Sequence, residues 1–218
     1  YDKGLVYEGF RILPYCWNDQ TPLSNHELRM DDEVYKMRKD PAVTVGYRLR
    51  TGPYADALAL IWTTTPWTLP SNMGVAVGPD VDYVVVESEA SGRPERYLLA
   101  EARVASYARD LWPGKSDAAV AARKDPSTRI VARLKGSELV GATYAPPFPY
   151  YEGYANAHQV LGEAFVTTED GTGLVHMSPG FGEDDKAALD AVGVETVVPV
   201  GPDGRFIFPV ADYQGLHV

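Results

Sequence analysis

Short apolar stretches separated by turn residues make up most of the chain. Some alternate apolar and polar positions and others run β-branched residues together, and both patterns are typical of β-strands. Turn signals stand between them, such as Gly-Pro-Asp at 78–80 and Ser-Gly-Arg-Pro at 91–94. We expect strands at 43–49, 58–61, 74–77, 83–86, 96–99, 129–134, 164–167 and 173–176.

Helical spacing of apolar residues is confined to a few segments. We expect helices at 100–111, 118–124 and 183–192, the last with Gly193 as its C-cap. Aromatic residues mixed with glycine and proline predict an extended ribbon at 1–23, and residues 197–210 predict a hairpin around the turn at 201–204. Together the pattern predicts a mixed, β-rich (α+β) fold with a β-barrel-like core and peripheral helices.

Composition and charge narrow the classes of function. The chain of 218 residues has 20 Lys and Arg against 30 Asp and Glu, so its net charge is −10 and a broad phosphate-tracking surface is excluded. The single Cys16 excludes an internal disulfide and a thiolate zinc cluster, and it fits a reducing compartment. No apolar run reaches membrane-spanning length, and we expect no signal peptide. Because the chain starts at Tyr1, we expect it to be a piece of a longer protein.

Residues 61–72 concentrate threonine, tryptophan and proline. An apolar strand at 58–61 runs into three adjacent threonines, and Pro66 then disfavours helix at Thr65 and removes a backbone donor. The threonines should therefore lie at a strand end, in a loop that Pro66 and Pro70 stiffen, which is a common place for a site. The alternative is a plain strand in which threonine serves β-propensity and proline ends the strand.

Residues 171–185 form a second dense segment. It reads as a glycine turn, a short strand ending in His176, a Pro-Gly loop and a helix start with three acidic residues at 183–185. Acidic residues suit the positive end of a helix dipole, and a lone histidine is often a hydrogen-bonded core residue. From the residues alone, both structural interpretations stay open beside a functional one.

Taken together, the two segments resemble the editing domain (connective polypeptide 1) of isoleucyl-tRNA synthetase. Trp-Thr-Thr-Thr-Pro-Trp-Thr-Leu-Pro-Ser-Asn at 62–72 matches its threonine-rich motif, and residues 171–176 and 180–185 match its second motif. Residues 15–25 and 215–218 look like its entry and exit ribbons. The resemblance implies a single domain over 1–218, with β-ribbon arms at approximately 1–41 and 205–218. Valyl and leucyl relatives usually carry Thr-Thr-Arg-Pro, so Thr65-Pro66 favours the isoleucyl type.

The resemblance implies hydrolysis of mischarged Val-tRNA(Ile), with valyl-adenylate as a candidate pre-transfer substrate, by a pocket that excludes isoleucine. One methylene gives a synthetic site only ~1–3 kcal/mol of selectivity, so a second, hydrolytic sieve is needed. The partners implied are the aminoacylated 3′ end of tRNA(Ile) and the rest of the synthetase in cis, in the cytoplasm and with no membrane. No cofactor is expected in this domain; ATP and Mg²⁺ belong to the missing aminoacylation domain.

The family match also assigns roles to residues. Asp185 would bind the α-ammonium, with Asp184 as the weaker alternative, and His176 would form the size-selective wall. Trp62 and Trp67 would lie near this wall. The hydroxyls and amides of Thr63, Thr64 and Thr65 would bind the water and the oxyanion. Thr68 and Asn72 would hold the loop or the terminal adenosine. Some relatives have a second cysteine where this chain has Asp19, so we expect no metal at the ribbon.

Other chemistries have weaker support. A Ser178-His176-Asp185 triad lacks the G-x-S-x-G context, and scattered histidines without H-E-x-x-H speak against zinc. We expect His26, His158 and His217 to be surface or ribbon residues. The aromatic loop at 146–151 should serve packing, with base stacking as the alternative. Valyl- or leucyl-type editing, and a non-catalytic module that positions the tRNA end, are the competing functions.

Overall fold

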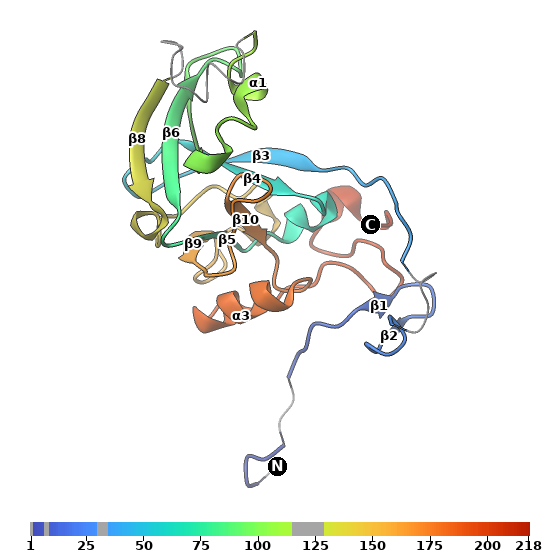
Figure 1. Cartoon of the computed structure of the whole chain (residues 1–218). Coiled ribbons are helices and arrows are strands. Elements are labelled where there is room, and N and C mark those ends of the chain that lie inside the picture. Colours follow the sequence, from blue (N-terminus) through green and yellow to red (C-terminus); the bar gives the residue numbers. More distant parts are fainter. Residues whose placement is uncertain (1, 7–8, 30–34, 115–128) are drawn as a thin grey trace.

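A computed structural model describes residues 2–6, 9–29, 35–114 and 129–218. Within these ranges, eight strands form one curled, mixed sheet in the order β8-β6-β7-β4-β10-β5-β9, with β3 paired to the other edge of β4 (Figure 1). The strands are β3 (Val43–Arg48), β4 (Leu58–Thr63), β5 (Gly74–Val77), β6 (Asp82–Ser88), β7 (Glu95–Ala100), β8 (Arg129–Lys135), β9 (Gln159–Gly162) and β10 (Leu174–Met177).

Strand β4 is the junction of this sheet. Along one edge it pairs antiparallel with all of β3, from Val43 opposite Thr63 to Arg48 opposite Leu58. Along the other edge it pairs parallel with β7 at its start and with β10 at its end, where Val175 lies opposite Trp62. The branch brings residues 171–177 beside the threonine segment, although about a hundred positions of chain separate them.

Helical segments cover the sheet at its two ends. The α-helix α1 (Ala108–Leu111) packs on β6 and β7 through Ala108 and Leu111, and α3 (Glu183–Ala191) packs under β5, β9 and β10 through Ala188 and Leu189 (Figure 1). The 3-10 helices are η1 (Pro66–Ser71), η2 (Glu101–Arg103), η3 (Gly136–Glu138), η4 (Pro149–Tyr151) and η5 (Ala211–Tyr213).

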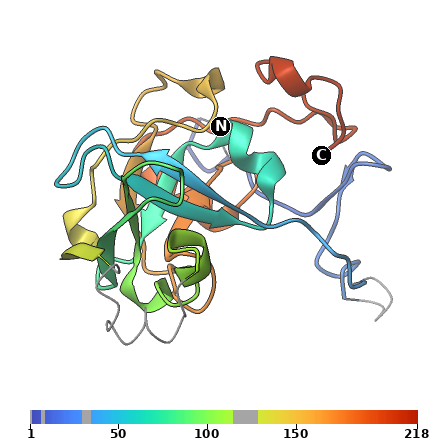
Figure 2. The same ribbon diagram turned by 90° about the horizontal axis from the view of Figure 1, so that it is seen from above.

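The two terminal segments lie side by side, away from the curled sheet. A small hairpin of β1 (Tyr15–Cys16) and β2 (Thr21–Pro22) stands beside the C-terminal segment in both views (Figures 1 and 2). The ring of Trp17 contacts the ring of His217, with centroids 4.3 Å apart. The aromatic loop at 146–151 packs on the same C-terminal segment, since Tyr150 donates a hydrogen bond to Asp212 and Phe148 contacts Tyr213. These contacts show that the loop serves packing, which is its expected role.

Several expected elements are confirmed and others are wrong. The strands within 43–49, 58–61, 74–77, 83–86, 96–99, 129–134 and 173–176 are confirmed, as is the helix at 183–192. The helix expected at 100–111 is wrong: Ser106 and Tyr107 both bond back to the carbonyl of Arg103, so the chain makes two separate turns, η2 and α1. The expected helix at 118–124 lies outside the described residues.

Two further expectations in the second half of the chain need correction. The strand expected at 164–167 is wrong: residues 164 and 165 form a turn, and the nearby strand is β9 at Gln159–Gly162, which pairs parallel with β5. The hairpin expected at 197–210 is reduced to an isolated bridge between Val200 and Phe206.

Candidate active site

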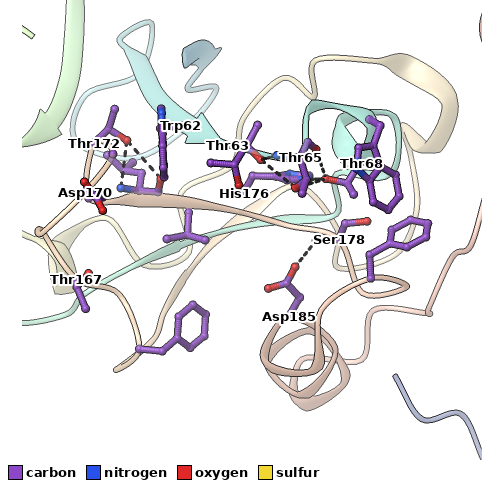
Figure 3. Close-up of a pocket in the computed structure, with 18 residues that line it drawn as sticks. Trp62, Thr63, Thr65, Thr68, Thr167, Asp170, Thr172, His176, Ser178 and Asp185 are labelled. Atoms are coloured by element: carbon purple, nitrogen blue, oxygen red, sulfur yellow. Dashed lines mark hydrogen bonds between the residues drawn. The ribbon is translucent and has the colours of Figure 1, made fainter. Parts of the chain in front are cut away.

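A cavity of about 360 Å³ lies where the end of β4 and η1 meet β10 and the first turn of α3 (Figure 3). Both motif segments contribute to its wall, together with the loop before β10. The described residues that line it are Trp62, Thr63, Thr64, Thr65, Trp67, Thr68, Phe165, Thr167, Asp170, Gly171, Thr172, Gly173, Leu174, Val175, His176, Ser178, Phe181 and Asp185. Two of these residues are acidic and none is Lys or Arg.

The threonines form a hydroxyl cluster at the strand end. Thr63 closes β4, and Thr65 is the N-cap of η1, which Pro66 begins. The Thr65 amide donates to Thr63 Oγ1 at 3.1 Å, and the two hydroxyl oxygens are 3.2 Å apart. Thr64 and Thr65 are exposed, whereas Thr63 and Thr68 are buried. The cluster therefore presents the hydroxyls of Thr64 and Thr65 to whatever occupies the cavity.

His176 is buried at the bottom of the same cavity. Its side chain comes from β10, and its two ring nitrogens meet Thr68 Oγ1 at 2.8 Å and the Asn72 side-chain amide at 2.7 Å. Burial lowers the pKa of His176 from 6.5 to about 4, against a smaller opposing effect of the hydrogen bond to Thr68. The ring is therefore neutral at physiological pH, and it contributes polar surface without a positive charge.

Asp185 supplies the negative charge of the site. It lies in the first turn of α3, and its Oδ2 accepts a hydrogen bond from the Ser178 amide at 2.9 Å. Burial raises the pKa of this carboxyl, the Ser178 amide lowers it, and the charge of Asp184 raises it further. A Cβ at position 182 would lie 2.7 Å from Asp185 Cγ, so only glycine there leaves room for the carboxylate.

Aromatic rings and a glycine loop complete the walls. Trp67 and Phe181 meet edge to face with centroids 4.8 Å apart, which joins η1 to the loop before α3. Trp62 packs against Gly171, where a Cβ would come within 2.8 Å of the indole. Arg103 donates to the carbonyls of Gly171 and Glu169, both at 2.8 Å, and so fixes this loop over Trp62.

Neither a metal centre nor a catalytic triad is assembled in the part of the chain that the structure describes. It contains no group of three or more His, Cys, Asp or Glu side chains placed to bind a metal ion. Ser178 Oγ bonds Ser71 Oγ at 2.7 Å rather than His176, and both ring nitrogens of His176 have other partners. Among the helices of the described ranges, none has the length and apolar composition needed to cross a membrane.

Comparison with known proteins identifies relatives of the chain. It is 53% identical over 222 residues to isoleucine–tRNA ligase of Mycobacterium tuberculosis strain H37Rv, 51% to that of Mycobacterium leprae and 46% to that of Tropheryma whipplei. Each match covers 100% of this chain and 19–20% of the relative's length. Over its whole length the chain is therefore similar to a segment that makes up about a fifth of these isoleucine–tRNA ligases. No family model matches it.

Solved structures show the same fold. The leucyl-type domain GlLeuRS-CP1 superposes with a TM-score of 0.51 at 18% identity, over 70% of this chain and 60% of that one. The editing domain of Plasmodium knowlesi cytosolic leucyl-tRNA synthetase gives 0.50 at 15% identity, over 72% and 64%. The chain thus has the same fold as these solved domains, with the expected strand-rich architecture and a half-barrel sheet.

The structure places the expected site residues of this chain unequally. All but Asn72 and Asp184 line the cavity. Asn72 is buried behind the wall and contacts His176, while Asp184 is exposed on α3. The buried position of Asn72 suits the alternative of holding the loop, and the binding role of Asp184 stays a prediction.

Other residues near the site were missed from the sequence. Phe165, Thr167, Asp170, Thr172, Ser178 and Phe181 also line the cavity. His158, expected at the surface, is buried, and its Nε2 lies 3.1 Å from the Asn72 carbonyl oxygen. Tyr144 donates to Asn72 Oδ1 at 2.6 Å. The density of glycine at 171–182 was a usable signal for the wall, but nothing in the sequence marks Tyr144 or His158.

Proposed function

We propose that this chain is an editing domain that hydrolyses Val-tRNA(Ile), and valyl-adenylate as a second substrate, in the cavity between η1, β10 and α3. The observation that carries the proposal is the half-buried carboxylate of Asp185 facing a cavity whose described lining includes no Lys or Arg. Because burial disfavours the charged form of Asp185, a ligand that brings a cation is favoured there. The free α-ammonium of an aminoacyl ester is such a cation.

The cavity also suits the rest of the aminoacyl end. Its volume of about 360 Å³ lies in the range of small-molecule sites. The neutral imidazole of His176 and the indole of Trp62 supply a wall that a valine side chain can contact without a competing positive charge. A branched side chain longer by one methylene then meets the wall, which gives the size selection that a single synthetic pocket lacks.

The threonine cluster positions the ester carbonyl and the attacking water. Asp185 holds the ammonium, and the ester carbonyl lies towards the exposed hydroxyls of Thr64 and Thr65. Water, oriented by the Thr65 hydroxyl, adds to the carbonyl carbon, and the Thr64 hydroxyl at the strand end donates a hydrogen bond to the developing oxyanion. The bond to the ribose oxygen breaks, that oxygen takes up a proton, and valine and uncharged tRNA leave. No covalent enzyme intermediate and no cofactor in this domain are required.

The rest of the machinery belongs to the larger protein. The chain spans 20% of the length of the mycobacterial ligase, so the remaining length offers the main tRNA-binding surface and the aminoacylation site that uses ATP and Mg²⁺. A net charge of −10 fits a domain that binds only the 3′ end of tRNA(Ile). The rest of the synthetase, in cis, delivers that end to the domain, and the reaction takes place in the cytoplasm.

Replacement of Asp185 tests the carboxylate anchor. We expect Asp185→Asn, in a full-length ligase carrying this sequence, to lower deacylation of Val-tRNA(Ile) by about 100-fold, because a buried ion pair with the ammonium is lost. Single-turnover hydrolysis of the labelled ester measures the change.

Two neighbours in the same helical turn serve as controls. Glu183→Gln removes an exposed acid next to the site and should leave the rate unchanged. Asp184→Asn decides between the two aspartates. A full rate in Asp185→Asn, with a large loss in Asp184→Asn, would move the anchor to Asp184 and contradict the proposed geometry.

A further inference from the structure

We propose that Tyr144, which lies outside the cavity, is a positioning residue for the active site. Acting through the side chain of Asn72, it holds His176 as the tautomer that carries its proton on Nε2. The tautomer assignment stands on geometry alone. Its consequence for hydrolysis rests on the function proposed above.

The Asn72 amide fixes the state of one ring nitrogen. Its Nδ2 lies 2.9 Å from the carbonyl oxygen of Gly74, which can only accept, so the amide nitrogen must face that side. Its Oδ1 then faces the hydroxyl of Tyr144, which donates at 2.6 Å. The second Nδ2 hydrogen points at His176 Nδ1, 2.7 Å away. Nδ1 therefore accepts a hydrogen bond and carries no proton.

Thr68 fixes the state of the other ring nitrogen. A threonine hydroxyl has one hydrogen, and Thr68 donates it to the Thr65 carbonyl at 2.8 Å. Thr68 Oγ1 can therefore only accept from His176 Nε2, which lies 2.8 Å away. The two sides of the ring independently require the proton on Nε2.

Burial makes each hydrogen bond of this network hard to replace. Tyr144 is 1%, Asn72 2%, Thr68 4% and His176 7% exposed, so bulk water cannot replace a lost partner. The Tyr144 ring is itself fixed by stacking on Tyr47, with centroids 5.3 Å apart. Loss of the Tyr144 hydroxyl would leave Asn72 Oδ1 buried without its donor, and the amide that fixes the imidazole would lose its anchor.

The tautomer sets the direction of the hydroxyl chain in the cavity. Thr68 has no hydrogen left to give, so Thr65, whose Oγ1 is 3.4 Å from that of Thr68, donates to it. Thr63 Oγ1 accepts from the Thr65 amide at 3.1 Å and donates its own hydrogen to Thr65 Oγ1 at 3.2 Å. Thr65 Oγ1 keeps one lone pair for the cavity, where it can accept a hydrogen bond from the attacking water and orient it.

A pair of tyrosine variants tests the link from Tyr144. Tyr144→Phe removes the hydroxyl that anchors Asn72. Tyr47→Phe is the matched control, because its buried hydroxyl has no hydrogen-bond partner among the described residues. We expect Tyr144→Phe to lower kcat for Val-tRNA(Ile) deacylation by about tenfold with KM unchanged, in a full-length ligase carrying this sequence. Tyr47→Phe should match the wild type.

The tautomer itself is read from the ¹⁵N shifts of the His176 ring in the 218-residue chain. We expect protonated Nε2 and bare Nδ1 in the wild type and in Tyr47→Phe, and an averaged signal in Tyr144→Phe. Asn72→Asp replaces the donor by an acceptor and should place a proton on Nδ1. The inference is overturned if wild-type Nδ1 is protonated, if Asn72→Asp leaves Nδ1 bare, or if Tyr144→Phe and Tyr47→Phe give identical ring signals. Absence of any wild-type deacylation would refute the proposed function, while the ring signals would still decide this inference.

Discussion

At the scale of the residue, the site combines a neutral, buried histidine with a half-buried carboxylate. His176 is neutral because it is buried among polar partners that are themselves uncharged, Thr68 and Asn72. Asp185 keeps a carboxylate where burial works against its charge. In the proposed mechanism the substrate ammonium is the counter-ion of this carboxylate. In the free site the carboxylate is partly desolvated without a cation, and binding of the ammonium compensates that cost.

The lowered pKa of His176 predicts how stability depends on pH. Its folded pKa of about 4 lies below the ordinary 6.5, so below pH 6.5 the unfolded chain takes up a proton that the folded chain refuses. The free energy of unfolding should therefore fall as the pH drops from 6.5 to 4, by roughly 3 kcal/mol from this residue. Burial also lowers the pKa of His158, which adds to the fall in the same direction.

Urea unfolding at a series of pH values measures this slope. His176→Gln should flatten the fall between pH 6.5 and 4, whatever its effect at neutral pH. His217→Gln changes an exposed histidine and should keep the wild-type slope. Parallel slopes in the two variants would contradict the buried, neutral state of His176.

Sequence patterns located the residues of the cavity wall better than the residues behind it. The threonine and glycine motifs stand out because several special residues occur together at 62–72 and 171–185. Tyr144 and His158 are single residues in ordinary surroundings, and they reach Asn72 only because the fold brings distant segments together. Local pattern carries no signal of such a contact.

At the scale of the element, the loop before β10 is held in place by three features of one residue. Gly171 adopts a positive φ of 63°, its carbonyl accepts from Arg103 Nε, and its missing side chain makes room for Trp62. The indole of Trp62 therefore has a fixed place in the cavity wall, and the shape of the pocket depends on a glycine.

Gly171→Ala tests this contact. The left-handed backbone costs an alanine about 1–2 kcal/mol of stability, and the new Cβ would push Trp62 into the cavity and lower deacylation. Gly153→Ala is the matched control, because Gly153 has a φ of 89° and an added Cβ there would meet nothing within 4 Å. Both variants should lose stability in thermal unfolding, Gly171→Ala the more because of its added contact with Trp62, and only Gly171→Ala should lose activity. Equal activities would show that Trp62 does not shape the site.

The strands were predictable and the irregular helical segments were not. Apolar–polar alternation identifies β3 and β8, which bury one face, and apolar runs identify β4 and β6, which are buried on both faces. Residues 104, 108 and 111 show helical spacing and are indeed buried, yet the chain turns between them because η2 is fixed to the loop before β10 through Arg103. A tertiary contact there overrides the local periodicity.

At the scale of the whole molecule, the parallel pairing of β10 with β4 creates the site. It joins two motifs that are far apart in sequence, and β4 separates this end of the sheet from the α1 end. Periodicity predicts a strand-rich fold without its pairing order, so the meeting of the two motifs could be expected only from the resemblance to editing domains. The sheet order is what turns two motifs into one cavity.

The central claim is that this cavity removes valine and spares isoleucine. The most direct measurement compares hydrolysis of Val-tRNA(Ile) and Ile-tRNA(Ile) by a full-length ligase carrying this sequence, under the same conditions. We expect the valyl ester to be cleaved at least about 100-fold faster, since size exclusion must exceed what one methylene supplies by binding alone. Equal rates of hydrolysis for the two esters would contradict the proposed function.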